Sequence, residues 1–140
     1  MYEYNCQVDR VVDGDTIDVT LDLGFSILHK CRVRLYGIDT PESRTRDLEE
    51  KARGKLSKKY LQDKINQGKQ IVIQTKLKDS KGKFGRVLGS VIVDRININN
   101  LMVLNHMAVH YTGQSKKEIA DAHLQNRDLL IQAGVYEIKS

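Results

Sequence analysis

Apolar and polar side chains alternate with a period of two in residues 4–9, 16–23 and 31–35, and this pattern limits the possible folds more than any other feature of the chain. Such alternation is typical of strands that bury one face. It predicts strands over residues 4–12, 16–23 and 26–38, the last long enough to curl around a small barrel. Asp13-Gly14-Asp15-Thr16 is a turn signal and predicts a hairpin, because Gly14 suits a positive φ.

A helical pattern follows the three strands. Apolar residues recur at four-residue spacing through residues 46–67, which predicts a helix with one buried face. Gly54 lies within this helix and weakens it by about 1 kcal/mol relative to alanine. Gly68 follows the last apolar residue and is expected to end the helix in the left-handed conformation. The predicted buried face consists of Leu48, Ala52, Leu56, Tyr60, Leu61 and Ile65.

Strands and helices also alternate in the second half of the chain. Residues 69–76 and 87–93 are predicted strands, and a short helix capped by Asn97 or Asn99 follows them. Ser115-Lys116-Lys117-Glu118 is a capping box that starts a last helix, and Gly134 is expected to close it.

Five short strands with a helix inserted after the third predict an α+β fold, namely a five-stranded OB-type β-barrel with three packed α-helices. Closure of the sheet is economical because it leaves few unpaired edges. The length of 140 residues fits a single domain over residues 1–140. Cys6 and Cys31 are too few for a disulfide framework and are expected to behave as small, largely buried apolar groups.

The overall charge and the hydropathy of the chain bear on its partners and location. The net charge of +5 and the pI of about 9.2 favour an anionic partner, of which nucleic acid is the commonest, although the same charge also serves solubility. No segment approaches the roughly 20 apolar residues of a membrane span. The first residues lack the basic and apolar regions of a signal peptide, so we expect a cytoplasmic protein without a membrane partner.

Three segments carry charged groups suited to phosphodiester chemistry. Residues 13–16 supply carboxylates, residues 34–42 supply one arginine and two carboxylates, and Lys83-Phe84-Gly85-Arg86 supplies a second arginine. Carboxylate and carbonyl oxygens suit Ca²⁺ or Mg²⁺ rather than Zn²⁺. Two arginines can clamp a phosphate while they stay charged at any working pH, and a further carboxylate could orient or deprotonate a water. Together these groups predict hydrolysis of a phosphodiester.

The motifs DGDT at 13–16, VRLYGIDTPE at 33–42 and KFGR at 83–86 occur in the order found in the staphylococcal nuclease-like, or thermonuclease, family. The chain resembles this family over nearly its whole length. The resemblance implies the five-stranded barrel with three helices that the pattern also predicts. It further implies a Ca²⁺-dependent nuclease that cleaves DNA or RNA at the 5′-oxygen and leaves 3′-phosphates.

The resemblance assigns metal binding to three residues. Asp15 and Asp39 would be the carboxylate ligands of a Ca²⁺ ion, and the backbone carbonyl of Thr40 would be a third protein ligand. Water and a phosphate oxygen of the substrate would complete the coordination. Asp13, by contrast, is expected to cap the turn without touching the metal.

The resemblance also implies roles at the phosphate. Arg34 would bind the scissile phosphate, and Arg86 would hold it from the other side. Glu42 would orient the attacking water or act as its general base. Lys83 would contact a terminal phosphate. Tyr111 is a candidate for stacking on a base, with a position in the core as the alternative.

A catalytically silent nucleic-acid-binding module of the same fold is the alternative function. Non-catalytic relatives lose the metal carboxylates or an arginine, whereas this chain keeps all five charged site residues, which favours an enzyme. The histidines share no metal spacing and are predicted to be structural or surface residues. His106 stands where the family usually has glycine after the second helix, and a left-handed helix end there would be costly. The four histidines are His29, His106, His110 and His123.

Overall fold

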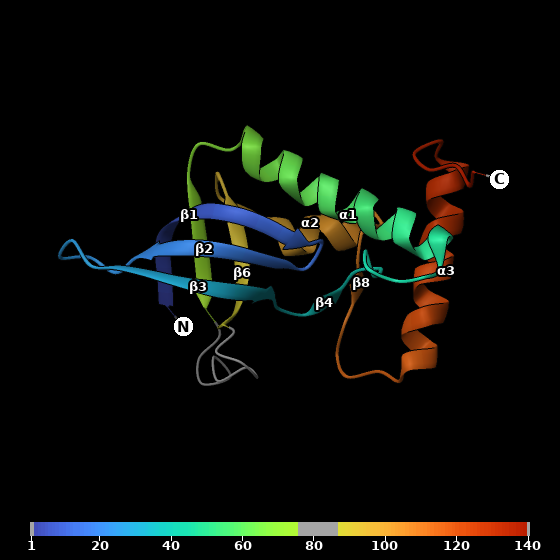
Figure 1. Ribbon diagram of the computed structural model, residues 1–140, viewed down its shortest axis with the longest axis horizontal. Coiled ribbons are helices and arrows are strands. Elements are labelled where there is room, and N and C mark those ends of the chain that lie inside the picture. The colour runs from blue at the N-terminus through green and yellow to red at the C-terminus, as the bar shows by residue number, and fades with distance from the viewer. Residues whose placement is uncertain (1, 76–86, 140) are drawn as a thin grey trace.

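Five strands close into a barrel in the computed structural model, which describes residues 2–75 and 87–139. Strands β1 (Tyr2–Asp13), β2 (Thr16–Asp22) and β3 (Leu28–Leu35) form an antiparallel meander (Figure 1). Strand β5 (Ile71–Thr75) pairs antiparallel with β1 on one side and with β6 (Val87–Val93) on the other. Parallel pairing between β3 and β6 completes the ring. The predicted five-stranded barrel is confirmed.

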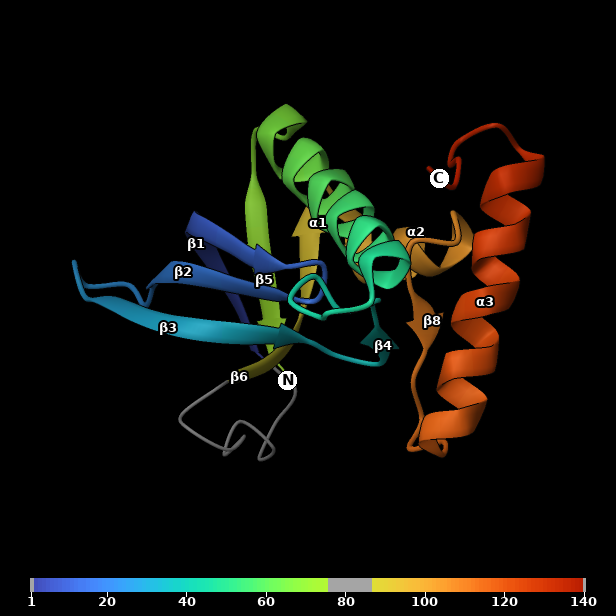
Figure 2. The ribbon, with the colours of Figure 1, turned by 45° about the vertical axis from the view of Figure 1, so that its right-hand side comes forward.

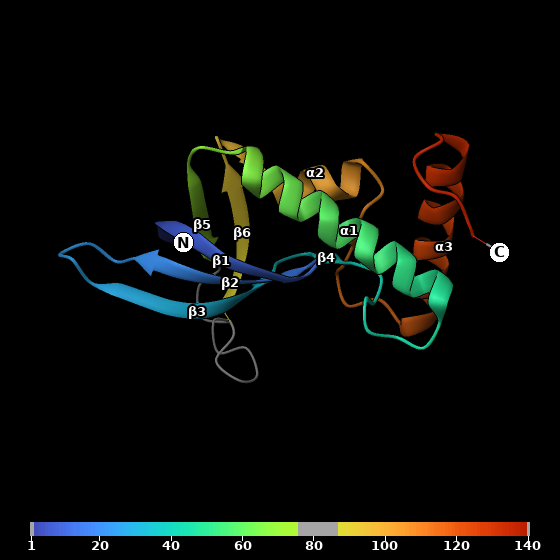
Figure 3. The ribbon, with the colours of Figure 1, turned by 45° about the horizontal axis from the view of Figure 1, so that its top comes forward.

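Within residues 2–75 and 87–139, three helices accompany the barrel, and each starts at a residue whose side chain accepts a hydrogen bond from the first turn. Asp47, Asn97 and Ser115 are these N-cap residues. The first half of the predicted capping box is confirmed, because the backbone N–H of Glu118 donates to Ser115 Oγ at 3.2 Å, and Ser115 Oγ itself donates to Glu118 Oε1 at 3.1 Å. Figures 1 and 3 show α1 beginning near α3 and running back toward the barrel, with α2 beside it. The helices are α1 (Leu48–Gln67), α2 (Ile98–Leu104), which directly follows the short strand β7 (Ile96–Asn97), and α3 (Lys116–Gln132).

The segment predicted as one strand over residues 26–38 breaks at Gly37, which has a φ of 77°. Strand β3 ends before it, and the short strand β4 (Ile38–Asp39) pairs antiparallel with β8 (Val109–His110) in a separate sheet. Figure 2 shows β4 and β8 between the barrel and α3. The prediction of a continuous strand is therefore wrong at its end, because the left-handed conformation of Gly37 turns the chain out of the barrel.

Asn99 holds the chain in place around this break. The side chain is 2% exposed, and its Oδ1 accepts a hydrogen bond from the backbone N–H of Val91 at 3.1 Å. Its Nδ2 donates to the carbonyl oxygens of Tyr36 at 3.0 Å and Gly89 at 3.3 Å. Asn97 is thus the cap of α2, and Asn99 ties α2 to β6 and to the exit of β3.

The predicted hairpin at residues 13–16 is confirmed, but Gly14 serves it in an unexpected way. Gly14 does not adopt the positive φ that the turn signal suggested. A Cβ atom at Gly14 would instead lie 2.9 Å from the Cβ of Ser57 and 3.0 Å from Oγ1 of Thr40. Gly14 is therefore required by close packing of the turn against α1 and the segment after β4.

The buried face of α1 differs from the predicted one in the first half of the helix. Leu48 is 76% exposed and Ala52 is also exposed, whereas Leu61 and Ile65 are buried as predicted. The first turns pack through small groups because the turn at residues 13–16 and the chain after β4 approach them closely. The buried residues of α1 are Arg53, Gly54, Ser57, Leu61 and Ile65.

The helix ends use two different devices. Gly68, after α1, has an extended φ of −85°, so the predicted left-handed glycine is wrong there. A Cβ at Gly68 would lie 2.1 Å from Cγ1 of Val93, and packing explains this glycine. Gly134, after α3, has a φ of 73° and closes the helix as predicted. His106, after α2, adopts the same conformation with a φ of 63°.

The core fills the barrel and continues beneath α1 and α2. Both cysteines are half-buried free thiols, and burial raises the pKa of Cys6 to about 12. Within the described residues, no helix is long and apolar enough to cross a membrane. The most buried large side chains are Ile17, Val19, Val33, Leu35, Leu61, Ile73, Val91, Asn99 and Met102.

Candidate active site

The turn after β1 places Asp15 beside the end of β3. The Asp15 carbonyl accepts a hydrogen bond from the backbone N–H of Leu35 at 2.8 Å. The Asp15 carboxylate accepts from Thr16 Oγ1 at 3.0 Å and from the backbone N–H of Thr40 at 3.3 Å. These contacts fix the carboxylate between two segments that are 25 residues apart in the chain.

The Arg34 guanidinium lies between two carboxylates. Its Nη2 atom is 3.4 Å from Oδ2 of Asp15 and 3.6 Å from Oδ1 of Asp39. Its Nη1 atom donates to the carbonyl oxygens of Leu35 at 2.9 Å and Ile38 at 3.0 Å, which fixes its orientation across the break after β3. The side chain is 20% exposed, so it is held firmly and still reaches solvent.

The oxygen atoms around Arg34 are suitable ligands for a hard cation. Asp15 and Asp39 offer carboxylate oxygens, and the Oγ1 atom of Thr40 is buried without a hydrogen-bond partner among the described residues. No group of three or more acidic, histidine or cysteine side chains is arranged to hold a metal within residues 2–75 and 87–139. Two carboxylates are ligands that Ca²⁺ and Mg²⁺ both accept, and backbone, water or substrate oxygens would complete the coordination of a cation bound here.

Glu42 is positioned through its main chain. Its backbone N–H donates to Oε2 of Glu50 at 3.2 Å, and the next residue, Ser43, donates its hydroxyl to Oδ1 of Asp13. Burial raises the pKa of the Glu42 carboxyl, and the negative charges of Asp15, Asp13, Asp39 and Glu50 raise it further. A carboxyl with a raised pKa is a better proton acceptor than an ordinary glutamate near neutral pH.

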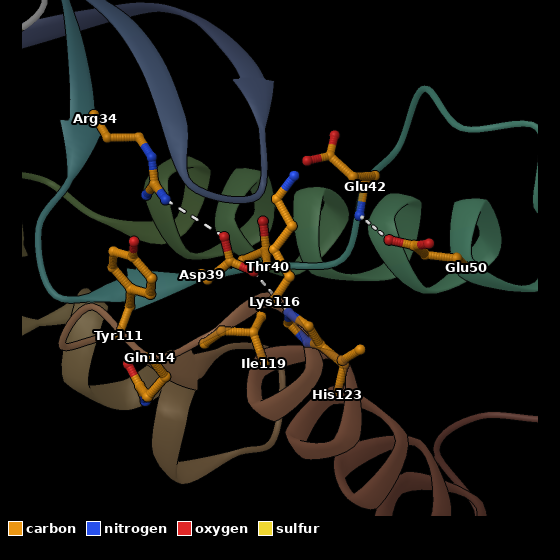
Figure 4. A pocket seen from close by; sticks show the side chains of 11 residues that line it. Arg34, Asp39, Thr40, Glu42, Glu50, Tyr111, Gln114, Lys116, Ile119 and His123 are labelled. Atoms are coloured by element: carbon orange, nitrogen blue, oxygen red, sulfur yellow. Dashed lines mark hydrogen bonds and ion pairs between the residues drawn. The ribbon is translucent and has the colours of Figure 1, made fainter.

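Most of the predicted site residues in the described chain line one pocket of about 600 Å³ (Figure 4). Arg34, Asp39, Thr40 and Glu42 form its wall on the barrel side. Tyr111 lies at its rim, 43% exposed, and its backbone N–H donates to the carbonyl of Gly37 at 2.7 Å. On α3 and the segment before it, the pocket is lined by Gln114, Lys116, Ile119, Ala120 and His123.

The lysine and arginine of the third motif cannot be placed. Lys83 and Arg86 lie outside the described residues. Their assigned roles therefore stay predictions from the resemblance.

Two further residues of this pocket were not anticipated as site residues. Lys116 extends from the start of α3 into the pocket (Figure 4). His123, predicted to be structural or on the surface, places Nε2 2.8 Å from Oδ2 of Asp39 and is 8% exposed. Four-residue spacing from Ile119 puts His123 on the inward face of α3, but no local signal reveals that Asp39 lies opposite.

Comparison with known proteins finds one family model and several relatives. Residues 32–129 match the family model described as staphylococcal nuclease homologue. Endonuclease YhcR of Bacillus subtilis (strain 168) is 33% identical over 115 residues, which cover 78% of this chain and 9% of that protein. Two further proteins of that strain are each 29% identical to this chain. For the SPbeta prophage-derived endonuclease YokF, the match covers 82% of this chain and 40% of the relative. For endonuclease YncB, it covers 74% of this chain and 46% of the relative. The chain thus spans less than half of each relative.

Proposed function

The chain belongs to the staphylococcal nuclease family, and on that premise we propose that it is a Ca²⁺-dependent nuclease that hydrolyses DNA or RNA and leaves 3′-phosphates. The observation that carries the proposal is the position of the Arg34 guanidinium between the carboxylates of Asp15 and Asp39. Opposite charges are held there at short range beside the carboxyl of Glu42, in an open pocket. The three relatives named above, which are endonucleases, support the same activity.

The acidic side of the site would hold the cation. Asp15, Asp39 and the carbonyl of Thr40 are its proposed protein ligands. When bound, Ca²⁺ would polarise the phosphate and help to generate the nucleophile. Arg34 is permanently charged and would bind the scissile phosphate where negative charge develops. Arg86 would hold the phosphate from the other side, and Lys83 would contact a terminal phosphate, both on the strength of the family motif.

Glu42 would act on the attacking water. The water oxygen adds to phosphorus, one water proton passes to the Glu42 carboxylate, and the bond from phosphorus to the 5′-oxygen breaks. The 5′-oxygen takes a proton from solvent, so the products carry a 3′-phosphate and a 5′-hydroxyl. The raised pKa of Glu42 supports this role, because the carboxylate is then a stronger base.

Digestion assays test the proposed activity. Plasmid DNA and RNA are incubated with the protein in Ca²⁺ or in a chelator, and the product ends are tested for extension by a polymerase before and after phosphatase treatment. We expect cleavage only with Ca²⁺ and extension only after phosphatase. Binding without any metal-dependent cleavage at ample protein would instead support the non-catalytic binding module.

Variants test the residue assignments. Arg34→Lys and Glu42→Gln should each lower kcat by orders of magnitude while the fold survives. Arg34→Lys keeps the charge but loses the planar guanidinium that can bind a phosphate through two hydrogen bonds, and Glu42→Gln removes the carboxylate that would accept the proton. Arg32→Lys is the matched control, since Arg32 lies two residues away on β3 and pairs with Asp18 at 2.8 Å. Unchanged turnover in either site variant would show that the wrong residue has been assigned.

A further inference from the structure

The contact between α3 and β4 joins two residues that are 84 positions apart. His123 Nε2 lies 2.8 Å from Oδ2 of Asp39 (Figure 4). A carboxylate accepts hydrogen bonds and cannot donate them, so the His123 ring must carry its proton on Nε2 in this contact. His123 and Leu130 are the buried residues of α3. One of the two buried residues of α3 therefore makes a polar contact with the site.

This contact divides the two oxygens of Asp39 between different partners. His123 holds Oδ2, while Oδ1 faces Arg34 at 3.6 Å. A carboxylate held on only one oxygen can turn about its terminal torsion, which has a broad energy profile. Because His123 contacts one oxygen of Asp39 and Arg34 the other, Oδ1 stays directed toward the Arg34 guanidinium, which also pairs with Asp15.

We propose that His123 is a positioning residue that fixes the Asp39 carboxylate so that Oδ1 is available to the cation. The proposal rests on the proposed function, since it concerns the Ca²⁺ site of the same pocket. Hydrogen bonds to ligating carboxylates orient them, and losing such a partner typically weakens metal binding 10–100-fold. The role is distinct from packing, because an apolar residue of similar size would fill the space without holding Oδ2.

The test compares Ca²⁺ binding and turnover in three variants of the full chain. His123→Ala removes the contact, His123→Gln keeps an amide N–H of similar reach, and His29→Ala removes an exposed histidine on β3 as the control. Calorimetric titration with Ca²⁺ in the absence of substrate gives the metal affinity. Nuclease assays over a range of Ca²⁺ concentrations give the half-saturating Ca²⁺ concentration, and assays at saturating Ca²⁺ give kcat and KM.

We expect His123→Ala to weaken Ca²⁺ binding at least tenfold and to raise the half-saturating Ca²⁺ concentration by a similar factor. His123→Gln should recover most of the affinity, and His29→Ala should match the original chain. If His123→Ala does not fold, His123→Gln and His123→Leu decide the matter, since only the former keeps the donor. Equal Ca²⁺ affinity in the Gln and Leu variants, or unchanged affinity in His123→Ala, overturns the proposal. Absence of Ca²⁺ binding and cleavage in the unsubstituted chain would overturn the proposed function and, with it, this inference.

Discussion

Gly54 of α1 lies against the main chain of Glu42, so closely that a Cβ atom at Gly54 would be 2.5 Å from the Glu42 carbonyl oxygen. The helix therefore sets the position of the proposed general base. We predict that Gly54→Ala displaces Glu42 and lowers kcat about 100-fold, because displacements near 1 Å have effects of that order. The higher helix propensity of alanine does not compensate for this clash, since the atoms in contact belong to the backbone of Glu42 and cannot move aside as the end of a flexible side chain can. Steady-state kinetics at saturating Ca²⁺ measure the effect.

Gly68→Ala is the matched control for this substitution. Its Cβ would lie 2.1 Å from Cγ1 of Val93, at the opposite end of α1 from Glu42. We expect a loss of stability of about 1–3 kcal/mol from overpacking with little change in kcat. An equal loss of kcat in both variants would mean that Gly54 acts through general stability alone.

We expect the ionised carboxyl of Glu42 to destabilise the folded chain when no cation is bound. Burial and the four nearby carboxylates raise its pKa in the folded state. The unfolded chain then releases this proton at lower pH, so stability falls as pH rises from the ordinary value of 4.5 through the raised pKa. We predict that Glu42→Gln lowers kcat by orders of magnitude and yet raises Tm at pH 7 in a chelator, by on the order of 1–2 °C.

Thermal unfolding at pH 7 and at pH 4 measures this trade-off. The gain in Tm should shrink at pH 4, where the unfolded carboxyl is largely protonated. Glu137→Gln serves as the control, because Glu137 is an exposed acid that lies outside the pocket. A Tm at pH 7 that is lower in Glu42→Gln than in the unsubstituted chain would contradict the prediction.

The barrel was predictable because its signals are local and repeated. Period-two alternation in separate stretches of residues 4–38 indicates three strands whatever they pair with, and the turn at residues 13–16 joins the first two as a hairpin. The helices were predictable for the same reason, since N-cap residues such as Ser115 act within one turn. These patterns depend on sequence neighbours, which the chain displays directly.

Contacts between distant segments were not predictable in this way. The sequence suggested a left-handed conformation for Gly14 and Gly68, and a loss of helix stability at Gly54. In the structure, each of these glycines instead allows another segment to approach closely. The pairing of His123 with Asp39 has the same origin, because nothing near either residue indicates the other. The role of Arg34 and Asp39 was inferred from a motif, and the motif carries no information on the wall that α3 contributes.

His106 carries strain that glycine would relieve. It ends α2 with a φ of 63°, and the backbone N–H of Met107 donates to the carbonyl of Met102 at 2.8 Å, as at other left-handed helix ends. A side chain in this conformation costs roughly 1–2 kcal/mol, partly offset by the greater freedom of glycine in the unfolded chain. We predict that His106→Gly raises Tm by about 2–4 °C without changing kcat. Thermal unfolding checks this, with Gly134→Ala as the reverse change; a lower Tm in His106→Gly would contradict it.

Glu49 ties α1 to the end of the chain. Its carboxylate accepts hydrogen bonds from Arg53 Nε at 2.7 Å and from the Tyr136 hydroxyl at 2.8 Å, and Arg127 Nη1 lies 3.4 Å away. Burial opposes ionisation, but the hydrogen bonds from Arg53, Tyr136 and Arg127 and the positive charge of Arg53 outweigh it and lower the pKa of Glu49. We predict that Glu49→Gln destabilises the fold by about 3 kcal/mol at pH 7, because it leaves the buried Arg53 without its counter-charge.

The effect of Glu49→Gln should depend on pH in a defined direction. A carboxyl with a lowered pKa in the folded state stabilises the protein fully above its unfolded value, and this contribution is lost as pH falls below about 4.5. Urea unfolding at pH 7, 4.5 and 3 should therefore show a difference between the two chains that narrows toward acid. Glu137→Gln is the control, since Glu137 is exposed and lies near Glu49 at the start of α1. A difference that stays constant across this range would mean that Glu49 stabilises the fold through shape and neutral hydrogen bonds rather than through its charge.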